Sequence, residues 1–175
     1  MNSVDVEVLR TAITWLRAGH RLVLGTVVKT WGSAPRPPGS LMVLRDDGLV
    51  TGSVSGGCVE DDLIHRLRTG ELPVERPEVT TYGGTLEATR RFNLPCGGTL
   101  QIVLEPVSEA TWLADLLARI ESHQRVQRLL DLASGTVSLE PARAGDTVAF
   151  DGTTLRTVFG PRYRLLIVGA TQIAR

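Results

Sequence analysis

The chain has 175 residues, of which 42% are hydrophobic, and its 19 basic and 19 acidic side chains give a formal net charge of zero. This length and composition suit one full domain with a buried core, and they exclude a disordered chain and the basic excess typical of nucleic-acid binders. No apolar run reaches transmembrane length and residues 1–19 lack a signal-peptide core, so we expect a cytoplasmic protein, without a membrane partner, whose two cysteines are reduced thiols.

The first half of the chain is predicted to form two helices around a strand and a hairpin. Apolar residues recur every three or four positions over residues 6–16 and 59–67, which indicates two helices with one buried face each. The strands expected between them are residues 21–29, 41–44 and 49–54. Residues 31–39 contain three prolines, which remove ladder donors, so we expect an ordered loop there.

The second half is predicted to be richer in strands. Residues 79–82 and 100–104 are strand candidates separated by a loop, and Ser108 is expected to cap a helix that buries Leu113 and Ile120. Short alternating runs separated by turns predict small β-hairpins at residues 126–132, 136–139, 147–150 and 154–159. The predicted fold class is therefore α/β, with a mixed sheet, packed helices and small β-hairpins in one domain.

The last apolar segment has a different character. Residues 163–168 are followed by Gly169-Ala170-Thr171, as at the start of a βαβ nucleotide-binding unit. Such a strand needs further elements to cover it, so we predict one domain at residues 1–160 and the truncated start of a Rossmann-like domain at residues 161–175. An unpaired apolar strand seeks a partner, so we expect it to pair with its own sheet, to be exchanged within a homodimer or to be disordered.

Four motifs resemble those of one known family, in that family's order. They are residues 32–39, 52–60, 94–98 and 103–106. On these residues the chain resembles the XdhC/CoxI family of xanthine dehydrogenase and carbon monoxide dehydrogenase accessory proteins.

The resemblance implies a chaperone rather than an enzyme. It would bind the molybdenum cofactor (molybdopterin) transiently, protect it during sulfuration and help to insert it into a xanthine dehydrogenase-like molybdenum hydroxylase. The implied partners are the hydroxylase apo-enzyme and a cysteine desulfurase. The residues 164–170 resemble the opening of the family's C-terminal Rossmann domain.

The expected site consists of three loops that each lie at a strand end. The residues expected to bind the cofactor are Ser33, Arg36, Ser55, Gly56, Gly57, Cys58, Glu60, Cys96, Gly97 and Gly98, with Cys58 as the metal ligand. No catalytic residue is assigned, because no nucleophile with a base and an orienting group is visible. Zinc is not expected, because neither a Cys-x-x-Cys nor a paired histidine spacing is present.

Each site assignment has a plainer alternative. The amides of Gly56 and Gly57 at a helix start favour an anion, and a thiolate at Cys58 suits molybdenum or sulfane sulfur, yet acidic residues in the same turn would repel a phosphate. Cys58 would otherwise be a small packing residue, and Cys96 part of a tight turn. A proline-stiffened loop preorganises Arg36 for an oxyanion, unless Arg36 is solvated or paired with Glu60 or Asp61.

Three further hypotheses remain open at this point. Trp31 borders the proline-rich loop and is a candidate for stacking on a pterin. The glycine-bounded segment at residues 165–170 suggests a fragment of an NAD(P)-dependent oxidoreductase, although Thr171 would crowd a pyrophosphate. A cofactor-free protein–protein adaptor would need none of the assigned ligands.

Overall fold

The computed structural model of the protein describes residues 3–32, 36–83 and 98–161. In chain order, the helices and strands within these ranges are α1 (Ser3–Arg17), β1 (Leu22–Trp31), β2 (Leu41–Arg45), β3 (Val50–Gly52), α2 (Cys58–Thr69), β4 (Glu78–Tyr82), β5 (Thr99–Val107), α4 (Thr111–Glu121), β6 (Val126–Asp131), β7 (Val137–Pro141), β8 (Ala149–Phe150) and β9 (Thr154–Phe159). Each corresponds to an element predicted from the sequence. The segment at residues 163–168 lies outside the described residues, so the division into two domains stays a prediction.

A five-stranded sheet with the order β3-β2-β1-β5-β4 forms the centre of the molecule. Strand β1 lies in its middle, and the first seven residues of β1 are buried. This burial explains the continuous apolar run, because a central strand covered on both faces needs apolar side chains on both.

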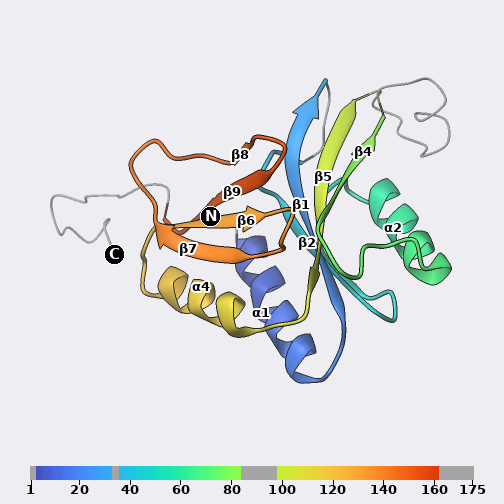
Figure 1. Ribbon diagram of the computed structural model, residues 1–175, viewed down its shortest axis with the longest axis horizontal. Coiled ribbons are helices and arrows are strands. Elements are labelled where there is room, and N and C mark those ends of the chain that lie inside the picture. The colour runs from blue at the N-terminus through green and yellow to red at the C-terminus, as the bar shows by residue number, and fades with distance from the viewer. Residues whose placement is uncertain (1–2, 33–35, 84–97, 162–175) are drawn as a thin grey trace, which may run out of the picture.

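The two faces of this sheet are covered differently (Figure 1). On one face α2 packs through Val59 and Leu63. The other face is covered by α1 and α4, and by a second sheet with the order β7-β6-β9-β8. In that second layer, Leu130 and Leu155 pack against Val28 and Val103 of the central sheet.

The helices, sheets and hairpins confirm the predicted fold class, and two details differ from expectation. The sequence predicts a mixed sheet, whereas every strand pair among the described residues is antiparallel. The reason is the path of α2. It carries the chain from β3 at one edge of the sheet to β4 at the other edge, so no parallel neighbours are created.

The second detail is the start of α4. The prediction that Ser108 caps this helix is wrong, because β5 extends to Val107 and Ala110 takes the N-cap position without a side-chain hydrogen bond. Ser108 is instead part of the connection between the two elements. In the described ranges, no helix has the combined length and apolar character needed to cross a bilayer.

Candidate functional site

Three connections leave the five-stranded sheet on the same side, at the ends of its strands. Trp31, the last residue of β1, pairs with Thr99 at the start of β5, and Tyr82, the last residue of β4, pairs with Leu100. The connections β1–β2 and β4–β5 therefore begin side by side. Strand β2 runs antiparallel to both β1 and β3, so β1 and β3 run in the same direction. The connection from β3 to α2 therefore leaves the sheet on the same side as the connection that follows β1. The described ends of the three connections therefore lie at the same ends of the strands, and Figure 1 shows the tips of β1, β4 and β5 together at the top.

Glycines allow two of these loops to touch at their bases. A Cβ atom on Gly83 would lie 2.3 Å from the carbonyl oxygen of Gly98, and one on Gly32 would lie 3.5 Å from the Cα atom of Gly98. Such an approach to Gly83 is open only to a residue without a side chain. Gly98, an expected site residue, therefore lies close to the ends of both β1 and β4.

The third loop is tied to this cluster through a tyrosine. The hydroxyl of Tyr82 donates a hydrogen bond to Oδ2 of Asp62 in α2, at 2.8 Å. Burial, followed by this contact with a carboxylate, raises the pKa of Tyr82 well above its usual range, so the phenol stays protonated and continues to donate. The bond fixes the first turns of α2 against the end of β4.

The loop before α2 is organised by one carboxylate, that of Glu60. Its Oε1 accepts from the hydroxyl of Ser53 and the amide of Val54 at 2.8 Å each, and from the amide of Ser55 at 3.0 Å. Its Oε2 accepts from the amide of Gly57 at 2.9 Å and from the Ser55 hydroxyl. Burial opposes ionisation, but these hydrogen bonds outweigh it and lower the pKa of Glu60 from 4.5 to about 2.

This arrangement changes the interpretation of the glycine amides. The amide of Gly57 donates to Glu60, and the amide of Gly56 donates to the hydroxyl of Ser53 at 2.9 Å. Gly57 is the N-cap of α2 and has a φ angle of 138°, a conformation that favours glycine. The donors expected to hold an external anion therefore hold groups of the protein itself, and Glu60 and Ser55 shape the loop.

Cys58 is the first residue of α2, next to this loop. It is partly buried and packs against the cluster that contains Val59 and Leu63. In the described part of the chain, no three His, Cys, Asp or Glu side chains are grouped as metal ligands would be. A metal bound at Cys58 would thus take its remaining ligands from a cofactor or from residues outside that part.

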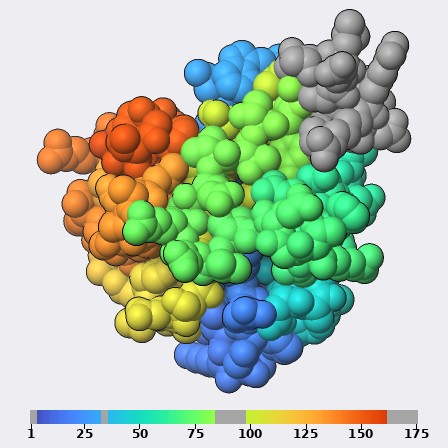
Figure 2. Space-filling view, turned by 45° about the vertical axis from the view of Figure 1, so that its right-hand side comes forward, coloured from blue at the N-terminus to red at the C-terminus, as the bar shows by residue number. Residues whose placement is uncertain are grey.

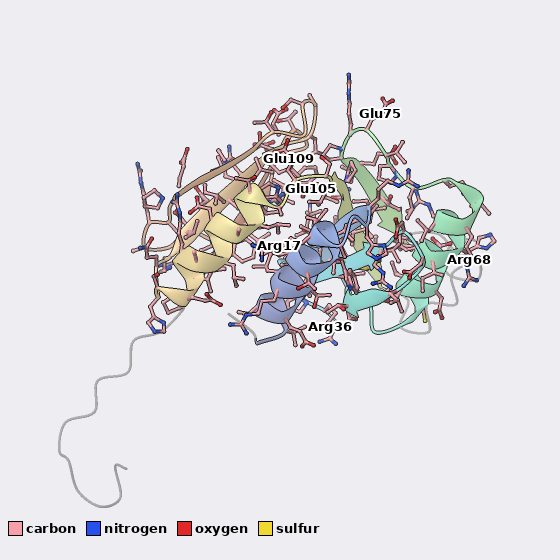
Figure 3. All side chains as sticks on the ribbon, turned by 90° about the horizontal axis from the view of Figure 1, so that it is seen from below. Arg17, Arg36, Arg68, Glu75, Glu105 and Glu109 are labelled. Atoms are coloured by element: carbon pink, nitrogen blue, oxygen red, sulfur yellow. The ribbon has the colours of Figure 1, made fainter. Side chains whose placement is uncertain are left out.

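Two basic side chains lie near the end of β1 that leads into the proline-rich loop. Arg36 lies at the periphery of the molecule with its side chain directed outward (Figure 3), and Lys29 is exposed on β1. The ion pairs found among the described residues include neither side chain, so the alternative in which Arg36 pairs with Glu60 or Asp61 finds no support. No sequence motif pointed to Lys29, although it is the single lysine of the chain.

The remaining expected site residues, Ser33, Cys96 and Gly97, lie outside the described residues. Their approach to Cys58 stays a prediction. Glu60 and Glu105, the two carboxylates that lie within the family-like motifs, are not close enough to act as an acid–base pair. The partners of Glu60 all lie in its own loop, whereas Glu105 is buried between the sheets and paired with Arg128.

A separate cavity of about 590 Å³ lies beside that buried pair. It is lined by α4 and the start of β7, with Glu105 and Trp112 in its wall. Figure 3 shows Glu105 and Glu109 beside α4, away from Arg36. A second cavity of about 440 Å³ is bordered by the segment that leads from α2 into β4, which Figure 2 shows in green on the surface.

Comparison with known proteins shows which proteins this chain is similar to. The model of the XdhC and CoxI family matches residues 15–83. Over 174 residues the chain is 32% identical to the molybdenum cofactor insertion chaperone PaoD of Escherichia coli (strain K12), an alignment that covers 96% of this chain and 52% of PaoD. Over 45 residues it is 44% identical to a probable xanthine dehydrogenase subunit of Bacillus subtilis (strain 168), covering 26% of this chain and 14% of that relative.

A solved structure supports the fold. The crystal structure of a xanthine dehydrogenase from Bacillus halodurans matches 90% of this chain and 53% of its own chain, with a TM-score of 0.63 at 21% identity. The chain therefore spans about half the length of PaoD and of this structural neighbour.

Proposed function

We propose that the chain, whose residues 15–83 match the XdhC and CoxI family model, belongs to this family, binds the molybdenum cofactor and helps to insert it into a molybdenum hydroxylase of the xanthine dehydrogenase type. The observation that carries this proposal is the similarity to an insertion chaperone along nearly the whole chain. In this role the protein acts as a cytoplasmic chaperone, and the chemistry belongs to the enzyme that receives the cofactor.

The geometry supports a binding site at the strand ends of the five-stranded sheet from which the three loops leave. Three loops leave these strand ends, and the described ion pairs leave Lys29 and Arg36 without a carboxylate partner. The cofactor carries a phosphate, so unpaired cations next to the loops match its charge. Glu60 would contribute indirectly, because it holds the loop from which α2 and Cys58 start.

Cys58 is the residue that we assign to the metal or its sulfur. Cys58 is the first residue of α2, beside the glycine-bearing loop, and the sulfur of a cysteine is a soft ligand that can bind soft metals or carry sulfane sulfur. When bound, the cofactor would supply the molybdenum centre, and the role of the protein would be to hold it and shield it.

The test is the conservative substitution Cys58→Ser. Parent and variant are loaded with molybdenum cofactor under anaerobic conditions, and the retained pterin is measured by its fluorescence after acid oxidation. We expect at least a tenfold loss of retention with an unchanged thermal unfolding temperature, because serine keeps the size of the side chain but removes the soft ligand. Cys96→Ser, measured in parallel, tells whether the second thiol contributes.

The outcome that contradicts the role of Cys58 is a variant that retains as much pterin as the parent. A parent that retains no pterin would instead contradict cofactor binding itself and favour the adaptor.

The wider proposal includes partners. A cysteine desulfurase would supply the terminal sulfur while the cofactor is held, and the apo-hydroxylase would then receive it. Native mass spectrometry of the purified protein tests whether a cysteine of this chain carries that sulfur, because a persulfide adds the mass of one sulfur atom. The same spectra report whether the chain forms a homodimer.

A further inference from the structure

Trp31 is exposed to an extent that packing does not explain. Its side chain ends β1 with 44% of its surface accessible, whereas Trp15 and Trp112 pack against the core. An indole has a large apolar area and prominent stacking faces, so exposure of this kind marks a candidate contact site for a ligand.

Lys29 lies next to Trp31 on the same face of β1. Its Nζ atom is 4.9 Å from the centroid of the Trp31 ring, a cation–π contact. Among the described ion pairs Lys29 has no carboxylate partner. The ammonium group is therefore held near the ring with its charge available to an anion.

The neighbouring strands place further polar side chains beside this pair. Lys29 pairs with Gln101 and Trp31 with Thr99 on β5, and Gln101 pairs in turn with Thr81 on β4. Residues paired in register lie on the same face of an antiparallel sheet. The amide of Gln101 donates to the hydroxyl of Thr81 at 3.4 Å. We call this surface, made of Lys29, Trp31, Thr81, Thr99 and Gln101, the strand-end platform.

No described element of the second layer covers this platform. Below it, Val28 and Val103 pack against Leu130 and Leu155 of the four-stranded sheet. Above that contact β1, β5 and β4 extend past the four-stranded sheet in Figure 1. The platform also adjoins Gly32 and Gly98, which lie at the bases of two site loops.

We propose that the strand-end platform binds the pterin part of the cofactor, with the ring stacked on Trp31 and the phosphate paired with Lys29. This inference rests on the proposed function, adds Trp31 to it as a stacking residue and assigns the phosphate to Lys29. Gln101 and the adjacent threonines offer amide and hydroxyl groups to the polar edge of the ring. The zero net charge of the chain disfavours the alternative of a single-stranded nucleic acid, which would stack on an aromatic within a basic groove.

Two pairs of variants test the platform in the full chain. Dissociation constants are measured by fluorescence for anaerobically prepared molybdenum cofactor and for pterin-6-carboxylate, a planar anionic pterin without metal. Trp31→Ala is expected to weaken binding of both probes about tenfold, while Trp31→Phe restores most of the affinity because stacking is retained. Lys29→Glu is expected to weaken binding by a similar factor, and Lys29→Arg to keep the parent value.

The matched control is Leu49→Ala, which truncates another exposed apolar side chain, 51% accessible, at the opposite edge of the sheet. It should bind both probes as the parent does. If Trp31→Ala and Lys29→Glu bind like the parent while Cys58→Ser loses the cofactor, the platform is wrong and the proposed function stands. If the parent binds neither probe, both proposals fail. If only binding of an apo-hydroxylase is lost in the variants, the platform is a protein contact and the inference is overturned.

Discussion

At the residue scale, Glu60 decides the conformation of the loop that precedes α2. Its two carboxylate oxygens accept hydrogen bonds from the residues between Ser53 and Gly57. These residues follow the end of β3, so their amides need a partner other than a neighbouring strand, and Glu60 provides it. It also occupies the N3 position of the helix, where a negative charge is favourable. The carboxylate predicted to contact a ligand is thus part of the scaffold.

Glu60→Gln should destabilise the protein in a pH-dependent way. The pKa of Glu60 is depressed to about 2 in the folded state, so its contribution is complete above pH 4.5 and is lost as the pH falls through 2. We expect a loss on the order of 2 kcal/mol at pH 7, which shrinks towards acid pH, measured by urea unfolding from pH 7 to pH 2. Glu75→Gln, an exposed control, should show no such trend. A Glu60→Gln difference that is constant with pH would contradict this assignment.

At the element scale, the candidate site is positioned by the ends of β1, β4 and β5. The ladders of β1, β4 and β5 bring Gly32, Gly83 and Gly98 together, and the Tyr82–Asp62 hydrogen bond adds α2 to the group. A small change at this junction should affect the candidate site and the fold together.

Two glycine substitutions separate backbone conformation from close contact. Gly70 ends α2 with a φ angle of 73° and has open space around it, whereas Gly83, with a φ angle of 86°, would place a Cβ atom 2.3 Å from a backbone oxygen. Gly70→Ala should therefore cost about 1–2 kcal/mol, the strain of the left-handed conformation alone. Gly83→Ala should cost clearly more, as measured by thermal unfolding. Equal losses would mean that Gly83 and Gly98 are not in contact.

At the scale of the whole molecule, the two sheets are joined by a buried ion pair. Nη2 of Arg128 on β6 lies 2.5 Å from both carboxylate oxygens of Glu105 on β5, and its guanidinium stacks on Trp112 of α4, 4.3 Å from the ring centroid. Both charged side chains are almost fully buried, at 2% and 5% exposure. The pair therefore connects three elements, and neither partner can be removed without leaving a buried charge.

Arg128→Met should destabilise the fold by about 3–5 kcal/mol, because Glu105 is left in the interior without its cation. The double variant Glu105→Leu with Arg128→Met should recover most of this loss, since apolar residues replace both charges. Chemical denaturation of the two single variants and the double variant gives the coupling energy. Additive losses would show that the pair does not act as a unit.

Much of the secondary structure could be predicted because it follows from local periodicity. The apolar spacing of α1 and α2 and the hairpin formed by β2 and β3 agree with the structure. The prediction for Ser108 failed because the length of β5 depends on its pairing with β1. Propensity for a cap cannot reveal where a tertiary contact ends a strand.

The sequence by itself determined the helices, the strands, the three motif-bearing loops and the family that they resemble, because these depend on neighbouring residues and on motif order. Only the tertiary structure decided that β1, β4 and the connection before α2 end on the same side of the sheet, that Glu60 accepts from the amide of Gly57, and that Lys29 and Trp31 face outward beside Gln101. The physical reason is register. Which side chains meet across strands depends on pairings between distant segments, and no local pattern specifies those pairings.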